Sequence, residues 1–179
     1  MKKKITAKEI AITGLMLAIC IVSQFFKNTS IFITGPIVNA CLILCTLAAG
    51  LVPGLILSAI TPITAFFITG NPVMAAIPLM IVMIMLGNMI LVFFVWLLGK
   101  RSKVELILGM VLGSLVKGAF MGLTISVWLL PSFLPEKMLP KLAVLKTNFS
   151  LYQVITALIG SVIAFIVWIP VKKVLNKGE

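Results

Sequence analysis

Apolar residues fill six long stretches of this chain, and short segments rich in proline, glycine, asparagine and lysine separate them. An α-helix needs about 20 residues to cross the hydrocarbon core of a bilayer, so a chain of 179 residues has room for six such spans and little else. The pattern predicts an all-α integral membrane protein in which residues 1–179 form one domain, a single bundle of six transmembrane helices. We expect the helices at residues 7–26, 36–50, 53–69, 73–98, 104–130 and 150–171.

Proline and glycine mark the boundaries of these helices. The Gly35-Pro36 pair places a proline where the first turn of the second helix tolerates it, and residues 70–72 read as a turn before the fourth helix. Pro62 interrupts the third span, so we expect it to kink that helix and to free a backbone carbonyl one turn earlier. Residues 131–148 contain three prolines and three lysines, which predicts the longest loop of the chain.

The composition supports a membrane protein, because 61% of the residues are hydrophobic and only 11% are charged. The net charge of +11 is spread unevenly over the loops: ten Lys and Arg residues flank the spans on the side of the N-terminus, and four lie on the opposite side. Cytoplasmic loops carry the excess of positive charge, so we expect both termini in the cytoplasm of a bacterial cell and the loops at 27–34, 70–72 and 131–148 outside. The scattered charge favours contact with anionic membrane lipid and argues against nucleic-acid binding.

Acidic groups are nearly absent, with four Glu, no Asp and no His in the whole chain. Proton relays, cation sites and zinc chemistry inside a membrane depend on these residues, so we expect no metal, no cofactor and no enzymatic activity. The cysteines, Cys20, Cys41 and Cys45, lie in apolar segments and are expected to pack there. The chain also lacks the glycine-rich phosphate loop of ATPases, so energy for any transport has to come from a partner.

One lysine, Lys117, lies deep inside the fifth apolar span. It is about 13 residues from the cytoplasmic end of that span, or about 20 Å at the helical rise, and a charge near mid-bilayer costs about 2.5–3.5 kcal/mol on insertion scales. Because the interior has no acid to pair with it, we expect its partner to be a ligand that carries a carboxylate, a phosphate or an electron-rich heterocycle. The alternative is a lysine that lies along the helix and reaches towards water.

A few other polar residues are candidates for the same binding site. Asn88 lies in the interior of the fourth span, and Asn39 and Thr64 lie closer to the outside, so these side chains are expected to line a polar cavity together with Lys117. Around its mouth we expect three further residues: Asn71, Trp128 and Tyr152. Interior Asn and Thr residues also tie helices together, and aromatic residues also anchor helices at the membrane interface, so both alternatives stay open.

Small residues recur on one face of the first helix. Ala7, Ala11, Gly14 and Ala18 fall within an arc of roughly 60° at about 100° per residue, and such a stripe lets another helix approach closely in a membrane. Its partner is either a neighbouring span or another protein. Two glycine pairs of the fifth span, at 109/113 and 118/122, lie on nearly opposite faces, which predicts a helix packed on both sides within its own bundle.

A basic six-span chain of this size without an ATPase motif, with the stripe Ala7-xxx-Ala11 continuing through Gly14 and Ala18, resembles the substrate-binding S component of energy-coupling factor (ECF) transporters. The resemblance covers essentially the whole chain in span number, topology and size. It implies that the stripe meets the coupling helices of a shared transmembrane subunit, that two ATPase subunits power the complex, and that the S component topples to carry its ligand inwards.

The sequence leaves the identity of the substrate open. A vitamin such as pantothenate fits the expected site, and so does a related carboxylate or a nucleobase-like precursor. A different class of function, a membrane scaffold or assembly factor that transports nothing, would use the stripe alone.

Overall fold

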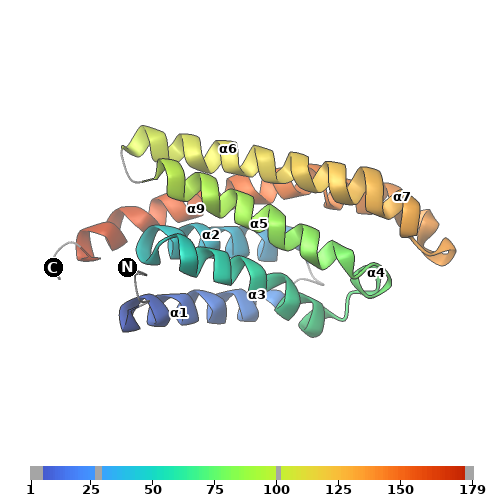
Figure 1. Cartoon of the computed structure of the whole chain (residues 1–179), viewed down its shortest axis with the longest axis horizontal. Helices are drawn as coiled ribbons and strands as arrows, with labels where there is room; N and C mark the ends of the chain where they lie inside the picture. Colours follow the sequence, from blue (N-terminus) through green and yellow to red (C-terminus); the bar gives the residue numbers. More distant parts are fainter. Residues whose placement is uncertain (1–5, 27–29, 100–101, 176–179) are drawn as a thin grey trace, which may run out of the picture.

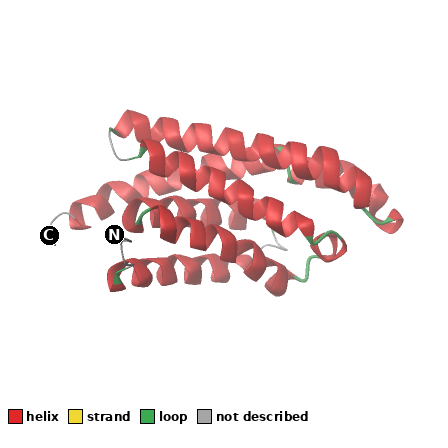
Figure 2. Ribbon diagram, viewed as in Figure 1, coloured by secondary structure: helices red, strands yellow, loops and turns green. Residues whose placement is uncertain are grey.

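The computed structural model describes residues 6–26, 30–99 and 102–175, which form an elongated bundle of helices (Figure 1). Six helical segments are long and apolar enough to cross a membrane, and the described residues form helices joined by short connections (Figure 2). The predicted fold class, an all-α integral membrane protein, is therefore confirmed. The elements are α1 (Ala7–Gln24), α2 (Ile31–Ala49), α3 (Leu51–Thr69), α4 (Pro72–Ala76), α5 (Leu79–Leu98), α6 (Lys103–Met121), η1 (Gly122–Leu129), α7 (Leu130–Phe133), η2 (Glu136–Lys141), α8 (Leu142–Asn148) and α9 (Leu151–Leu175).

α1 begins and α9 ends at one end of the bundle, and α4 and α7 lie at the opposite end (Figure 1). Several lysines used to predict the topology, among them Lys2, Lys3, Lys4, Lys27, Lys100 and Lys177, lie outside the described residues, as do Arg101 and part of the predicted loop at 27–34. The assignment of the two ends to the two sides of the membrane therefore stays a prediction.

The second helix begins earlier than expected, at Ile31 rather than at Pro36. Ser30 caps it, since its side-chain oxygen accepts a hydrogen bond from the backbone N–H of Phe32 at 3.2 Å. Pro36 then lies inside the helix, where it has no N–H to donate to the carbonyl of Phe32. The prediction of a helix start at Pro36 is wrong, because Ser30 already caps the helix at its start.

The expected fourth span at 73–98 is interrupted. A short helix, α4, ends at Ala76, and α5 begins at Leu79. Ile77 between them has φ −128° and ψ 77°, because Pro78 disfavours the helical conformation in the residue before it. The prediction of one continuous helix is wrong at this proline.

The expected loop at 131–148 is largely helical. It contains most of α7, the 3-10 helix η2 and the helix α8. Leu142, Leu145 and Phe149 pack against a buried cluster formed by Val73, Ile77, Met80, Met121, Ile125, Leu129, Leu130 and Leu134. These helices were not predicted, because the prolines and lysines of the segment are typical of a loop. The leucines that pack the segment against the bundle lie between them.

α6 lies between α5 and α9, and its glycines permit both contacts. A Cβ atom at Gly109 would lie 2.8 Å from the carbonyl oxygen of Phe94 in α5. On the other face, a Cβ at Gly118 would collide with Val154 in α9, and one at Gly122, the first residue of η1, would lie 3.3 Å from Cβ of Ser150, just before α9. The two glycine pairs thus pack on different neighbours, as their positions on opposite faces predict.

We expect a cysteine in place of Lys141 to react with a membrane-impermeant thiol reagent in intact cells, and a cysteine in place of Lys103 to stay unlabelled. Both side chains are exposed and lie at opposite ends of the bundle. A difference in labelling therefore reports the side of the membrane and not the burial of the side chain. The background lacks the three native cysteines, and labelling after lysis is the control. Labelling at 103 but not at 141 in intact cells would reverse the predicted topology.

Candidate binding cavity

A cavity of about 260 Å³ opens among the helices in the half of the bundle that includes α4 and α8. The end of α1, the start of α2, the second half of α3, α5, α6 and α9 contribute to its wall. Its apolar lining residues are Ile31, Val38, Pro62, Ala65, Met74, Ile84, Met121, Leu145 and Phe149. Its polar lining residues are Gln24, Thr34, Asn39, Thr61, Asn71, Asn88, Lys117, Asn148 and Gln153.

Lys117 and two asparagines form the polar centre of this cavity. The ammonium nitrogen of Lys117 donates to Oδ1 of Asn39 at 2.6 Å and to Oδ1 of Asn88 at 2.8 Å. The three side chains come from α6, α2 and α5, so the contact ties three helices together at one point. Asn39 is fixed further, because its Nδ2 donates to the carbonyl oxygen of Gly35 at 2.9 Å.

Chemistry fixes the orientation of both amides. An ammonium group only donates, so each asparagine has to turn its oxygen towards Lys117. Two of the three N–H groups of the lysine are used in this way, and one is left for another acceptor. The Nδ2 group of Asn88, a donor, is likewise set on the side away from the lysine.

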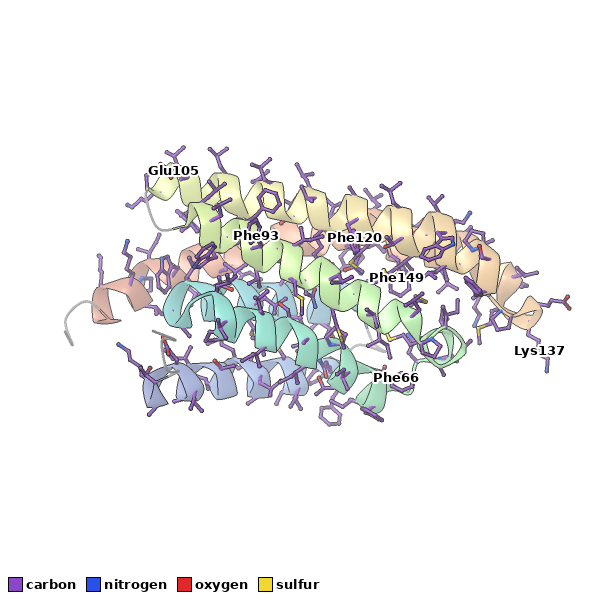
Figure 3. The ribbon with its side chains drawn as sticks, viewed as in Figure 1. Phe66, Phe93, Glu105, Phe120, Lys137 and Phe149 are labelled. Carbon is purple, nitrogen blue, oxygen red and sulfur yellow. The ribbon has the colours of Figure 1, made fainter. Side chains whose placement is uncertain are left out.

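The side chain of Lys117 points into the bundle and does not lie along the outer surface of α6. Its side chain is only 2% exposed, and its ammonium group ends on two amides inside the bundle. The outer surface of the bundle carries large apolar side chains, among them Phe93 on α5 (Figure 3).

The charge at the centre is compensated by dipoles and not by an acid. Lys117 is the one ionisable residue among the described residues that line the cavity, and none of them is Asp or Glu. Neutral amide oxygens stabilise an ammonium group but leave its charge in place. The cavity therefore favours a group that is negative or rich in hydrogen-bond acceptors.

Four of the predicted site residues line the cavity: Lys117, Asn39, Asn88 and Asn71. Asn71 also caps α4, because its Oδ1 accepts hydrogen bonds from the backbone N–H groups of Val73 at 2.9 Å and Met74 at 3.3 Å. This cap leaves the Nδ2 donor of Asn71 for other partners.

The structure places the other three predicted residues outside the cavity lining. Thr64 donates its hydroxyl hydrogen to the carbonyl oxygen of Thr61 at 3.0 Å, an interaction within α3. Trp128 is 52% exposed on the outside of η1, and the ring of Tyr152 lies 5.0 Å from that of Phe32. The bond of Thr64 stays within its own helix, so it neither lines the cavity nor ties two helices together.

Sequence reasoning missed five polar lining residues: Gln24, Thr34, Thr61, Asn148 and Gln153. Gln24 and Gln153 are the two glutamines of the chain, and each lies at the end of an apolar span on the side of the cavity. That shared position was an available signal. The threonines gave none, since Thr is common in membrane helices as a packing residue.

The stripe on α1 faces away from the bundle. Ala7, Ala11, Gly14 and Ala18 are all exposed, and a Cβ atom at Gly14 would meet nothing within 4 Å. The buried face of α1 carries other residues, including Cys20, Ser23 and Gln24. Within the described part of the chain, the stripe therefore does not serve internal packing.

The chain is a six-span helical bundle with a cavity, a buried cation and a smooth exposed helix face, features that suit a membrane-embedded binding protein. The family model for the ECF transporter, substrate-specific component, matches residues 8–172 of this chain. The chain therefore belongs to the substrate-specific components of ECF transporters, as the sequence resemblance predicted. It is a multi-pass membrane protein that binds substrate for uptake, and it is not an enzyme. Searches of curated proteins and of solved structures find no match to it.

Proposed function

We propose that this protein binds a small water-soluble nutrient, a vitamin or a related precursor with an anionic or acceptor-rich group, and delivers it across the bacterial cytoplasmic membrane. Two ATPase subunits, acting through a coupling transmembrane subunit, power the uptake. The observation that carries the substrate class is the Lys117 ammonium group, held by Asn39 and Asn88 in a cavity whose described lining has no acid. Membership of the family favours this function over a scaffold that transports nothing.

Electrostatics supports an anionic or acceptor-rich substrate group. Burying a charge without a counter-ion is costly, and the two amides compensate only part of that cost. A carboxylate or phosphate that reaches the third N–H of Lys117 forms a charge-assisted hydrogen bond, which is about twice as strong as a neutral one. A cationic substrate would meet repulsion from the same group.

The dimensions of the cavity support a small substrate. Its volume of about 260 Å³ is slightly below the range of about 300–1,000 Å³ typical of sites for drug-sized ligands. Apolar side chains such as Met74, Ile84 and Phe149 line the cavity beside its polar groups, so a compact compound with both polar and apolar parts fits best.

Mass spectrometry of small molecules retained by the gently purified protein tests this function. We expect a retained compound with a carboxylate, a phosphate or an electron-rich heterocycle. Retention of a permanent cation, or of no small molecule from cells that take up the full range of nutrients, would contradict the proposal.

We further propose that the stripe on α1 is the surface that meets the coupling subunit. The support is its exposure and the open space above Gly14, because small residues let helices approach closely where lipid offers no hydrophobic drive. An exposed face of this kind on a peripheral helix leaves room for a second helix.

Replacing Ala11 by tryptophan or Gly14 by leucine should abolish uptake and co-purification with the coupling subunit, while the isolated protein binds substrate nearly as before. The bulky side chain blocks close approach of the partner but meets no residue of its own bundle at Gly14. Ile19→Trp is the matched control, because Ile19 is also exposed but lies about 110° away from the stripe around the helix. Normal uptake by the stripe variants, or loss of their fold, would refute the docking role.

A further inference from the structure

Two buried polar atoms in the wall of the cavity have no hydrogen-bond partner within the described residues: Oε1 of Gln24 and Oγ1 of Thr61. Gln24 is 1% exposed and Thr61 is 2% exposed, and both residues line the cavity. Buried polar atoms are nearly always paired in native proteins, and each exception calls for a reason. Two exceptions side by side in the wall of one cavity point to a common partner.

The unpaired atom of Gln24 is an acceptor, and its environment fixes this assignment. The other end of the amide, Nε2, donates to the carbonyl oxygen of Thr61 at 3.0 Å. A carbonyl only accepts, so the amide cannot be turned around without losing this contact. Gln24 therefore presents an oxygen that needs an N–H or O–H group.

Thr61 differs from the other threonines on the same helix. Thr64 and Thr69 donate their hydroxyl hydrogens to backbone carbonyls of α3, at 3.0 Å and 2.6 Å. Thr61 makes no such bond, although its position in the helix offers it carbonyls in the preceding turn. Its hydroxyl therefore has no partner among the described residues, and it lies next to Gln24, whose Nε2 donates to the Thr61 carbonyl.

The polar groups in the cavity wall leave different hydrogen-bonding capacity. On α5 and α6, Asn88 and Lys117 leave donors, whereas on α1 and α3, Gln24 leaves an acceptor and Thr61 a hydroxyl, which can donate or accept. We propose that Gln24 and Thr61 form a second recognition point, which binds a neutral N–H or O–H group of the substrate while Lys117 binds its acceptor-rich end. This inference rests on the proposed function and adds a specificity to it: a substrate that carries both kinds of group.

The donor is neutral because the wall does not compensate a second positive charge. No carboxylate is found among the described lining residues, and a substrate ammonium would add to the charge of Lys117. A hydroxyl, an amide N–H or a ring N–H pairs with the Gln24 oxygen at no such cost. Compounds with the anionic group alone would leave the Gln24 oxygen unpaired and bind less tightly.

The test is retention of compounds from an equimolar mixture of water-soluble vitamins and their precursors, measured by mass spectrometry on the full-length protein in detergent. Thr61→Val removes the hydroxyl and keeps the shape and the backbone carbonyl that holds Gln24. Gln24→Met removes the amide and keeps the chain length. Thr69→Val is the matched control, because it deletes a hydroxyl from the same helix outside the cavity lining.

We expect the wild-type protein to retain a compound with both an acceptor-rich group and a neutral donor. Its retained amount should fall at least tenfold in Thr61→Val and Gln24→Met and stay unchanged in Thr69→Val. Thr61→Val should unfold at no lower temperature than the wild type, since the hydroxyl that it loses is unpaired in the protein.

The outcomes separate this inference from the proposed function. Retention that is lost in Lys117→Met but kept in both Thr61→Val and Gln24→Met would overturn the second recognition point alone. A retained compound without a neutral donor would do the same. A wild-type protein that retains nothing from the mixture would contradict the proposed function, and this inference with it.

Discussion

Replacing Lys117 by methionine should weaken substrate binding at least tenfold while the protein still folds. Removing one partner of a buried, hydrogen-bonded charge pair typically costs about 2–5 kcal/mol, and Lys117 is the one cation in the described lining of the cavity. The variant leaves Oδ1 of Asn39 and of Asn88 unpaired but also removes the cost of burying a charge, so the two effects on stability oppose each other. Calorimetry with the compound retained by the wild type measures the change in affinity.

Two further variants make this prediction specific. Lys117→Arg should restore binding only in part, because a planar guanidinium cannot occupy the position of an ammonium between two amide oxygens without displacing them. Lys141→Met, which deletes an exposed charge from η2, should bind as the wild type does. An unchanged affinity in Lys117→Met would refute the proposal that Lys117 binds the acceptor-rich group of the substrate.

Replacing Gly160 by alanine should strongly destabilise the protein and weaken binding as well. A Cβ atom at this position would lie 2.7 Å from the carbonyl oxygen of Pro36 and 2.7 Å from Cβ of Asn39. The first contact is backbone and cannot move without separating α9 from α2, so we expect a loss of about 1–3 kcal/mol or more, as for other overpacked sites. Because Asn39 accepts a hydrogen bond from Lys117, the same displacement should disturb the proposed binding centre.

Thermal unfolding in detergent measures this effect, and Gly14→Ala is the matched control. A Cβ at Gly14 meets nothing within 4 Å, so that variant should be as stable as the wild type or gain about 0.5–1 kcal/mol from the lower flexibility of the unfolded chain. Equal stability of the two variants would show that the contact between α2 and α9 is looser than the structure has it.

The cluster of Lys117, Asn88 and Asn39 was predictable because polar residues are rare in apolar spans. Lys117, Asn88 and Asn39 have no reason to lie in lipid-spanning segments unless they meet each other or a ligand, and the structure brings the three together. Thr61 was not predictable, since a threonine usually satisfies itself on its own helix. Only the structure shows that this one does not, whereas Thr64 does.

The helix boundaries were predicted less well than the number of membrane spans. Six spans follow from length and hydropathy. The prolines are harder to interpret, because Pro36 lies inside a helix whereas α4 ends just before Pro78. Whether a proline lies inside a helix or ends it depends on the neighbouring caps and packing. The π-helix η1 (Gly122–Leu129) also has no clear sequence signal. It changes the angular positions of the residues that follow Gly122, so the side on which Trp128 lies could not be read from a helical wheel.

The most direct test of this account is an experimental structure of the protein with the compound that it retains. The account predicts density for that compound inside the cavity, with an acceptor within hydrogen-bonding distance of the Lys117 ammonium group and with Asn39 and Asn88 beside it. Density for the compound at another place, with the cavity around Lys117 filled by protein side chains, would contradict it.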